Sequence, residues 1–429
     1  MKLALSLGVT TVVVSLASPA QAIQPLSAFI EASDDANTDL QITRSTNEQR
    51  DAEADRSTGA LLPSFSAQGT YTRNQFEVAF PAMAIGGGTG TIVILPQNQW
   101  DASLTLSVPI IDVAGWERRK AAHAANDGAK ADVEATRADV ARRVTRAYFQ
   151  LMANEALLVA AQKALAVSQA NVAVVTDRRG GGTATELDVQ RASADVSRAE
   201  QELSSASFAV VTDRRTLETL SGLSPEPVSQ FPIDDLREEA PIEHWMTDTS
   251  RLPAVQSAEL AQRSAAAGAD AASVAWLPTV SASAQERFTN APSLTLHKSY
   301  YPLQATATWK LDATMPAAVR AQRAQAATSA VRARASKRSA EDAIFQDYYQ
   351  VRSSIEKARS ARAQVQAETA AAQLARDRFG GGLATQLDVL QAEQDLFKAE
   401  VARIQADADL VYARAALRLD AAGPEGMKP

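Results

Sequence analysis

Apolar and polar side chains follow two different periods along this chain. Apolar residues alternate with polar ones in the stretches Ser64–Thr72, Trp100–Ile110, Val280–Thr289 and Tyr301–Leu311. Because successive side chains of a strand point to opposite faces, this alternation predicts four strands, each with one apolar and one polar face. Elsewhere the apolar residues recur every seven positions, which predicts long helices that pair as coiled coils.

The seven-residue period runs along two pairs of predicted helices. In each pair a helix of about 65 residues, the first starting near Val113, leads into a glycine-rich turn, and a second helix follows. We therefore expect two antiparallel hairpins whose tips are the glycine turns. Their apolar stripes are Val144, Leu151, Leu158, Leu165 and Val172; Val189, Val196, Leu203, Val210 and Leu217; Ile344, Val351, Ala358, Val365 and Ala372; and Val389, Leu396, Leu410 and Leu417, with Arg403 interrupting the last stripe.

The whole pattern is present twice. Residues 177–189, DRRGGGTATELDV, return 200 positions later as residues 377–389, DRFGGGLATQLDV. Further upstream the offset grows by 15 residues, and the glycine-rich segment 86–90 is the natural place for a longer loop in the first copy. Each copy is expected to contain a helix, two strands, a long helix, a turn and a second helix. The predicted organisation is a first repeat at 23–222, a connector rich in proline and acidic residues at 223–250, a second repeat at 251–423 and a tail at 424–429.

The first 22 residues predict an export signal. Lys2 precedes the apolar stretch Leu3–Leu16, and the small residues Ala20 and Ala22 form a cleavage site. A buried N-terminal helix is the alternative interpretation. No apolar run after residue 22 approaches the roughly 20 residues of a membrane-spanning helix. If the chain crosses a membrane, we therefore expect it to do so as strands.

Composition removes several classes of function. The 429 residues include no cysteine, which excludes disulfides, thiolate metal sites, a cysteine nucleophile and a lipid on an N-terminal cysteine. The net charge of −7 argues against general nucleic-acid binding. His123, His244 and His297 are far apart in the sequence, and no glycine run continues into a phosphate-binding loop. We expect no enzyme activity, no metal and no cofactor.

The four strands fit either a soluble, half-buried sheet or part of a membrane barrel. Their length and the aromatic residues near their ends are typical of outer-membrane strands, whose apolar side faces lipid. A sheet in a membrane cannot leave its edges unpaired, and outer-membrane barrels have at least about eight strands. Two chains would supply eight strands and three would supply twelve. An eight-stranded barrel is filled by its own side chains, so a conduit favours three chains.

The order of these features resembles the TolC-like outer-membrane efflux factors. The resemblance rests on Leu62 and Pro63, the paired strands, the long helix, the motif R-x-G-G-G-x-x-T-x-x-D-V and the helix after it, all of them repeated. It covers nearly the whole mature chain. It implies a mainly α protein with a membrane β-barrel part, in which three chains form a twelve-stranded barrel continued by an α-helical tunnel into the periplasm. The implied function is the passive exit duct of a tripartite efflux or type I secretion system.

The same resemblance assigns roles to residues at the hairpin tips. Asp388 matches an aspartate that lines the narrow periplasmic mouth, and Asp188 matches one that helps to hold the mouth closed. Phe379, Ala384 and Gln391 stand where the best-known member has a tyrosine, an arginine and a second ring aspartate, so a single acidic ring and a looser or apolar lock are expected. The tips would contact a periplasmic adaptor (membrane fusion) protein, which joins an inner-membrane transporter of the RND or ABC type. The implied docking residues are Gly180, Gly181, Gly182, Thr183, Gly380, Gly381, Gly382 and Leu383.

Purely structural roles are the alternative for these residues. Thr185 with Asp188, and Thr385 with Asp388, have the T-x-x-D spacing of a helix capping box. The glycines can serve as turn residues, and the arginines Arg178 and Arg378 can pair with nearby acidic side chains. For the whole chain, the alternative is a periplasmic coiled-coil scaffold or adaptor with a soluble β domain, although an adaptor would not need two equal pairs of strands.

Overall fold

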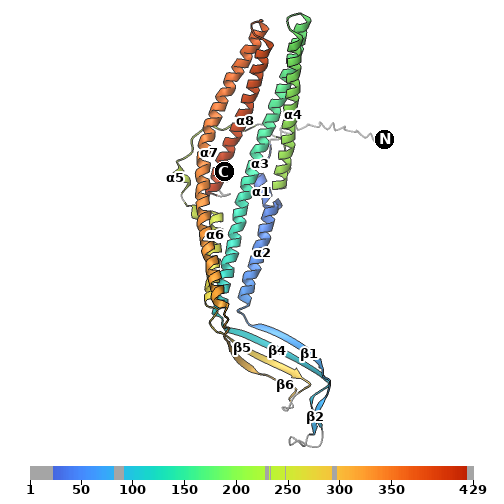
Figure 1. Cartoon of the computed structure of the whole chain (residues 1–429), viewed down its shortest axis with the longest axis vertical. Helices are drawn as coiled ribbons and strands as arrows, with labels where there is room; N and C mark the ends of the chain where they lie inside the picture. The colour runs from blue at the N-terminus through green and yellow to red at the C-terminus, as the bar shows by residue number, and fades with distance from the viewer. Residues whose placement is uncertain are drawn as a thin grey trace, which may run out of the picture. The chain divides into compact units, whose positions relative to one another are not determined.

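A computed structural model describes residues 23–81, 91–227, 231, 233–246, 248–291 and 297–422. The predicted export signal at 1–22, the glycine-rich segment 86–90 and the tail at 424–429 lie outside these residues. The described chain is mainly helical, with one larger sheet (Figure 1). It divides into two compact units, Met1–Thr38 with Ala138–Trp245 and Ile344–Pro429, and Asp39–Arg137 with Met246–Ala343. Each unit takes part of both predicted repeats, whose own limits remain predictions.

The larger sheet contains all four predicted strands. They are β1 (Ser64–Arg73), β4 (Asn98–Ile111), β5 (Thr279–Thr289) and β7 (Leu303–Thr308), in the order β1-β4-β5-β7, and every pair is antiparallel. A two-residue strand, β6 (Ser299–Tyr300), also pairs with β5, beyond the end of β7. β7 is shorter than the alternation predicts, because regular pairing ends at Thr308.

The register of the sheet places the apolar positions on one face. Phe65 lies opposite Leu106, Leu106 opposite Ala284, and Ala284 opposite Leu303. This face is uncovered in the single chain, since Phe65 is 69% exposed and Leu303 is 74% exposed. Glu286 is an exception: it lies opposite Leu104 and therefore shares the apolar face.

A second, smaller sheet is not predicted by the sequence pattern. β2 (Val78–Pro81) pairs with β3 (Thr91–Leu95), and the two strands flank the segment in which the first repeat is 15 residues longer. The expected long loop is therefore, in its described part, a pair of strands. Their runs of four and five residues are too short for alternation to be recognised.

Four helices adjoin the larger sheet in the unit that contains it. α2 (Thr38–Gly59) and α6 (Pro253–Ser273) lead into β1 and β5, whereas α3 (Val113–Gly180) and α7 (Met315–Gly380) follow β4 and β7. Hydrogen bonds give their order, with Asn126 of α3 donating to Asp51 of α2 at 2.7 Å, and Ser264 of α6 donating to a carbonyl of α3 at 2.9 Å. Ser336 of α7 donates to a carbonyl of α6 at 3.1 Å. The order α2-α3-α6-α7 thus follows the order of the strands.

The other unit contains the coiled-coil hairpins. α3 and α4 (Glu186–Ser221) form one hairpin, α7 and α8 (Gln386–Ala422) form the other, and α1 (Leu26–Ala36) packs against α4. Every residue of the predicted stripes is buried or half-buried, and the most deeply buried side chains include Leu151, Leu217, Leu410 and Leu417. Arg403, at the break in the last stripe, pairs with the fully buried Asp407 at 3.3 Å. The charge in the stripe is therefore neutralised within the helix.

One described helix, α3, contains a stretch that is long and apolar enough to cross a membrane by length and composition. From the sequence, no apolar run after residue 22 is expected to approach the length of a membrane-spanning helix, and this stretch of α3 contradicts that expectation. A single helix of this kind is weak evidence for a membrane span, because core helices of soluble proteins meet the same criterion.

Candidate functional site at the hairpin tips and the seam between the hairpins

Both hairpin tips end their first helix in the same way. The amide of Thr183 donates to the carbonyl of Arg178 at 2.9 Å, and the amide of Gly182 donates to the carbonyl of Arg179 at 3.0 Å. This pair of bonds requires a left-handed residue after the helix, and Gly182 and Gly382 have φ of 74° and 73°. In each glycine triplet, only this third glycine has a positive φ.

The helices that leave the tips begin with capping boxes, as the T-x-x-D spacing predicts. The Asp388 carboxylate accepts hydrogen bonds from the amide and the hydroxyl of Thr385, both at 2.7 Å, and the amide of Asp388 donates to that hydroxyl at 3.3 Å. Thr185 and Asp188 repeat the arrangement in the first hairpin. The Thr385 hydroxyl and amide hold the pKa of Asp388 below its ordinary value, and the Thr185 amide and hydroxyl do the same for the pKa of Asp188. Both carboxylates stay charged in neutral and mildly acidic solution.

Arg178 connects the two tips. Its guanidinium donates to the carbonyl of Phe379 at 3.0 Å and to that of Gly380 at 3.5 Å, and lies 4.0 Å from the centre of the Phe379 ring. The arginine thus binds carbonyls at the C-terminal end of α7, where a positive charge is favoured, and stacks on an aromatic ring. The sequence suggested a surface ion pair for Arg178, and this was wrong. We call this set of contacts the Arg178 clamp.

The remaining predicted tip residues lie on the surface or contact their own hairpin. Leu383 is 84% exposed at the second tip, whereas Arg179 of the first tip pairs with Glu186 in the helix that follows. Gln391 stands where the best-known family member has a second aspartate of the acidic ring. Its side-chain amide donates to Asp395 on the same helix at 2.8 Å. Asp188 is half-buried and Asp388 is exposed. The structure gives both aspartates a capping role, and their place at a mouth stays a prediction.

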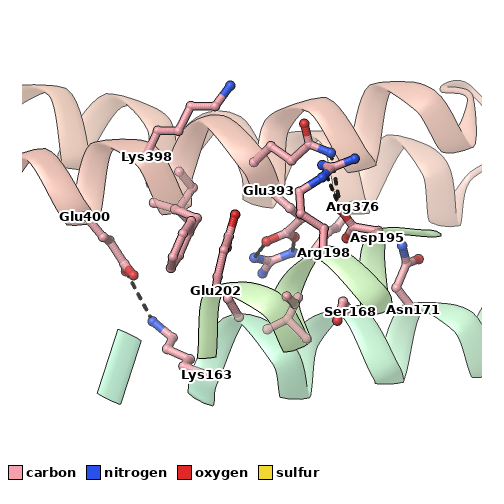
Figure 2. A pocket seen from close by; sticks show the side chains of 16 residues that line it. Lys163, Ser168, Asn171, Asp195, Arg198, Glu202, Arg376, Glu393, Lys398 and Glu400 are labelled. Atoms are coloured by element: carbon pink, nitrogen blue, oxygen red, sulfur yellow. Dashed lines mark hydrogen bonds and ion pairs between the residues drawn. The ribbon is translucent and has the colours of Figure 1, made fainter. Parts of the chain in front are cut away.

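A cavity of about 130 Å³ lies along the seam between the hairpins (Figure 2). Apolar side chains from three helices line it, namely Val167, Ala199, Leu396 and Phe397. Polar contacts cross the seam beside it, with Lys163 of α3 3.4 Å from Glu400 of α8 and Gln394 of α8 donating to Asp195 of α4 at 3.2 Å. Burial raises the pKa of Glu202, which also lines the cavity. We call this cavity and its charged margin the seam groove.

A cluster of charged side chains joins three helices nearer the C-terminal end of α8. Arg142 of α3 lies 2.5 Å from a carboxylate oxygen of Asp420 on α8 and 3.4 Å from one of Asp347 on α7. Burial raises the pKa of Asp347 to about 7, the neighbouring Asp420 adds to the rise, and Arg142 opposes it. Two carboxylates therefore share one guanidinium between the repeats.

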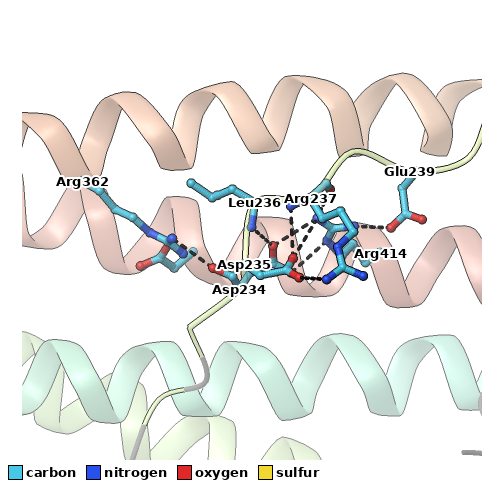
Figure 3. Close-up of polar contacts among 8 residues, drawn as sticks. Asp234, Asp235, Leu236, Arg237, Glu239, Arg362 and Arg414 are labelled. Atoms are coloured by element: carbon cyan, nitrogen blue, oxygen red, sulfur yellow. Dashed lines mark hydrogen bonds and ion pairs between the residues drawn. The ribbon is translucent and has the colours of Figure 1, made fainter.

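The connector is bound to the second hairpin by two arginines (Figure 3). Arg414 of α8 is 10% exposed and contacts Asp234, at 2.8 Å, and Glu239. Arg362 of α7 donates to the carbonyl of Asp234 at 3.0 Å and lies 2.8 Å from Asp407. The sequence predicts an irregular connector, and its regular parts are short, namely α5 (Ile242–Trp245) and the 3-10 helix η2 (Thr249–Arg251). Its acidic side chains anchor it, which the composition alone did not predict.

The fold is shared with solved outer-membrane channels. CusC matches with a TM-score of 0.80 at 16% identity, over 93% of this chain and 92% of that chain. Campylobacter jejuni CmeC matches with 0.79 at 16% identity, over 93% and 85%, and the open state of Neisseria gonorrhoeae MtrE with 0.77 at 19% identity, over 94% and 89%. A comparison with curated proteins found no match.

The sequence itself matches the family model described as Outer membrane efflux protein, over residues 30–223 and 249–422. The two matched segments fall in the two predicted repeats and leave out most of the connector. The chain belongs to the outer membrane efflux protein family. It is an outer-membrane efflux protein, and it has the fold of the solved outer-membrane channels. The alternative of a periplasmic scaffold or adaptor with a soluble β domain is therefore set aside.

Proposed function

We propose that three copies of this chain form a passive duct, with a twelve-stranded barrel continued by a helical tunnel. The observation that carries this proposal is the larger sheet, whose four long strands are β1, β4, β5 and β7. Its apolar face is uncovered, and β1 and β7 each have a single neighbour in the part of the chain that the structure describes. A membrane sheet must pair its edges, and three such sheets joined edge to edge supply twelve strands.

The duct acts without catalysis. Among the described residues, no group of three or more His, Asp or Glu side chains could hold a metal ion. The His residues have no catalytic spacing, and the sequence has no phosphate-binding loop. Energy for export comes from a partner, an inner-membrane transporter of the RND or ABC type, in an efflux or type I secretion system.

The hairpin tips and the seam groove form the surface that binds a periplasmic adaptor. Leu383 offers an exposed apolar side chain at the second tip, and the groove offers an apolar floor between charged margins of both signs. A helix with an apolar stripe flanked by charges fits such a surface. The glycine tips supply close approach, because the backbone there carries no side chain.

Asp388 forms the acidic ring of the periplasmic mouth in this proposal, with Asp188, Phe379 and Gln391 beside it. Three carboxylates around one axis attract cations and repel anions. The test compares Asp388→Asn with Asp188→Asn in planar bilayers, because both substitutions weaken a capping box but only the first removes the ring. We expect cation selectivity to fall in Asp388→Asn and to persist in Asp188→Asn. Equal selectivity in the wild type and both variants would place Asp388 outside the conducting path.

A further inference from the structure

Two bands of aromatic side chains border the apolar face of the sheet. Trp116, Trp276 and Trp309 lie where strands join helices and are 51%, 58% and 59% exposed. Tyr71 and Trp100 lie opposite one another at the far end of β1 and β4, and are 66% and 51% exposed. Exposed aromatic side chains at both ends of an apolar strand face mark the two surfaces of a membrane. The helix end of the sheet is then the surface that faces the periplasm. We call Trp116, Trp276 and Trp309 the inner band, and Tyr71 and Trp100 the outer band.

The helices that leave the sheet carry cations close to the inner band. Lys120 of α3 and Arg320 of α7 occupy matching positions of the two repeats, 200 residues apart, and Arg323 lies one turn beyond Arg320. The first part of α7 carries a large excess of positive charge, since residues 315–340 include six basic side chains and no acidic one. Within the described ranges, neither Arg320 nor Arg323 has an ion pair, whereas Lys120 lies 3.4 Å from Glu117.

These cations share one face of the helical layer. On α3, His123 and Asn126 contact α2 while Ala121 contacts α6, and Lys120 falls between these two sides, four residues after Trp116. On α7, Gln322 and Ser336 mark the side next to α6, and Arg323 is rotated from Gln322 by about 100°. Because α3 and α7 run in the same direction on either side of α6, these rotations bring Trp116, Lys120 and Arg323 to the same face. Arg320 lies between that face and the free edge of α7.

The distance from the band suits a lipid headgroup. Arg320 is five residues from the first residue of α7, which is about 8 Å along the helix. The headgroup zone on one side of a bilayer is about 5–8 Å thick, so an arginine side chain at this level reaches it. Arg334 and Arg338 lie on the same side of α7 about 20 Å further along, more than twice the screening length of about 8 Å in physiological salt.

We propose that Lys120, Arg320 and Arg323 bind the phosphate groups of anionic phospholipids in the membrane leaflet that faces the periplasm. The occupant follows from charge, because unneutralised arginines next to an apolar, aromatic-bordered face match a headgroup that is anionic above an apolar tail. Arginine also binds phosphate through two parallel hydrogen bonds. The inference rests on the outer-membrane location of the sheet and is independent of the conducting path.

The test measures which lipid surrounds the inner aromatic band. The full trimer, with Trp100→Phe to silence the outer band, is reconstituted into phosphatidylcholine bilayers that contain brominated phosphatidylglycerol or brominated phosphatidylcholine. Bromine quenches tryptophan fluorescence at contact range, so the ratio of the two quenching levels reports lipid preference. Arg320→Gln with Arg323→Gln is compared with Arg334→Gln and Arg338→Gln, which removes the same charge from the same helix further from the membrane.

We expect the starting protein to prefer phosphatidylglycerol and the Arg320/Arg323 pair of substitutions to reduce the preference by about fivefold for each arginine. The Arg334/Arg338 pair should leave the preference unchanged. Equal quenching by the two lipids in the starting protein would overturn the proposal, as would an equal loss in both double variants. Conductance of the same samples tests the duct separately, so a failure of the proposed function would be recognised on its own.

Discussion

At the residue scale, a contact between the two tips comes from the first repeat and has no counterpart from the second. Arg178 binds the end of α7 in the other hairpin through two carbonyls and the Phe379 ring, whereas Arg378, its match in the second repeat, is exposed. No contact of this kind is found for Arg378 among the residues that the structure describes. The clamp therefore joins the first tip to the second through Arg178, and Arg378 adds no equivalent contact.

Removal of the clamp should loosen the periplasmic end of the duct. In Arg178→Gln the charge, both carbonyl contacts and the stacking on Phe379 are lost, so we expect a larger single-channel conductance in planar bilayers. Arg378→Gln makes the same chemical change at the matching position and should leave conductance at the wild-type level. If both variants conduct like the wild type, the clamp plays no part in closure.

The Arg142 cluster predicts a pH dependence of stability. The pKa of Asp347 is raised by burial to about 7, so the folded protein holds this proton more tightly than the unfolded chain does. The associated stability is present at acidic pH and is lost between about pH 4 and pH 7, with a slope of at most about 1.4 kcal/mol per pH unit. Asp347→Asn is neutral at every pH and should therefore gain thermal stability over the wild type at pH 7.5 but not at pH 5.

Thermal unfolding of the trimer at the two pH values checks this prediction. Asp139→Asn is the control, because Asp139 pairs with Arg143 on an exposed part of α3, 3.0 Å away. That control should show no such pH-dependent difference. A constant difference between Asp347→Asn and the wild type at both pH values would contradict the raised pKa.

The roles of residues whose partners are close in the sequence could be predicted. The roles of residues whose partners are distant in the sequence could not. The capping boxes could be predicted because Thr385 and Asp388 interact within one turn, where spacing in the sequence determines the geometry. The contacts of Arg178 could not be predicted, because its acceptors are backbone carbonyls about 200 residues away. Every residue has such a carbonyl, so the sequence does not mark the ones that accept. The same holds for Arg414, whose partners lie in a connector without regular structure.

At the scale of elements, β1, β4 and β5 were predicted with nearly correct limits because one of their faces is mostly apolar, whereas β7 is shorter than predicted. The register confirms this pattern and shows where it fails, at Glu286, whose neighbours across β4 and along β5 are Leu104, Ala284 and Phe288. The hairpin of β2 and β3 was not predicted, since its short runs adjoin a glycine-rich segment. Alternation needs length before it can be distinguished from chance.

The position of Glu286 predicts a gain in stability on substitution. A carboxylate on the apolar face loses hydration when that face enters lipid, and near the middle of a strand this is unfavourable by up to about 2 kcal/mol. We expect Glu286→Gln to raise the unfolding temperature of the membrane-inserted protein. Gln285→Glu, next to it on the polar face, is the reverse control and should have a small effect. A lower unfolding temperature in Glu286→Gln would show that the carboxylate has a favourable partner in the assembled protein.

At the scale of the whole molecule, the duplication and the need for partner chains could be predicted from the sequence. The repeat is visible in the residues themselves, and four strands cannot close a membrane sheet. The proposed adaptor-binding surface could be predicted only in part. The tips are visible as glycine triplets, but the seam groove is built from α3, α4 and α8 and exists only after the hairpins pack.

Single cysteines can test this surface, because the chain contains none of its own. With a periplasmic adaptor co-expressed and carrying cysteines along its hairpin, Leu383→Cys at the tip and Val167→Cys in the seam groove should form disulfide cross-links in intact cells. Phe208→Cys, at a position of α4 that is 72% exposed and does not line the groove, should remain unlinked. Cross-linking at all three positions, or at Phe208→Cys alone, would contradict docking at the tip and seam.

The Arg178 clamp also bears on how such a chain can have arisen. A half-length ancestor would have closed the same ring with six identical subunits, and every boundary between neighbouring hairpins would have been alike. In such a ring Arg178 would meet another arginine, since residue 179 in the first copy corresponds to Phe379 in the second. Fusion of the two genes allowed alternate boundaries to evolve separately. The boundary inside the chain now holds an arginine against an aromatic ring, and in the proposed trimer the boundaries between chains need not keep the same contact.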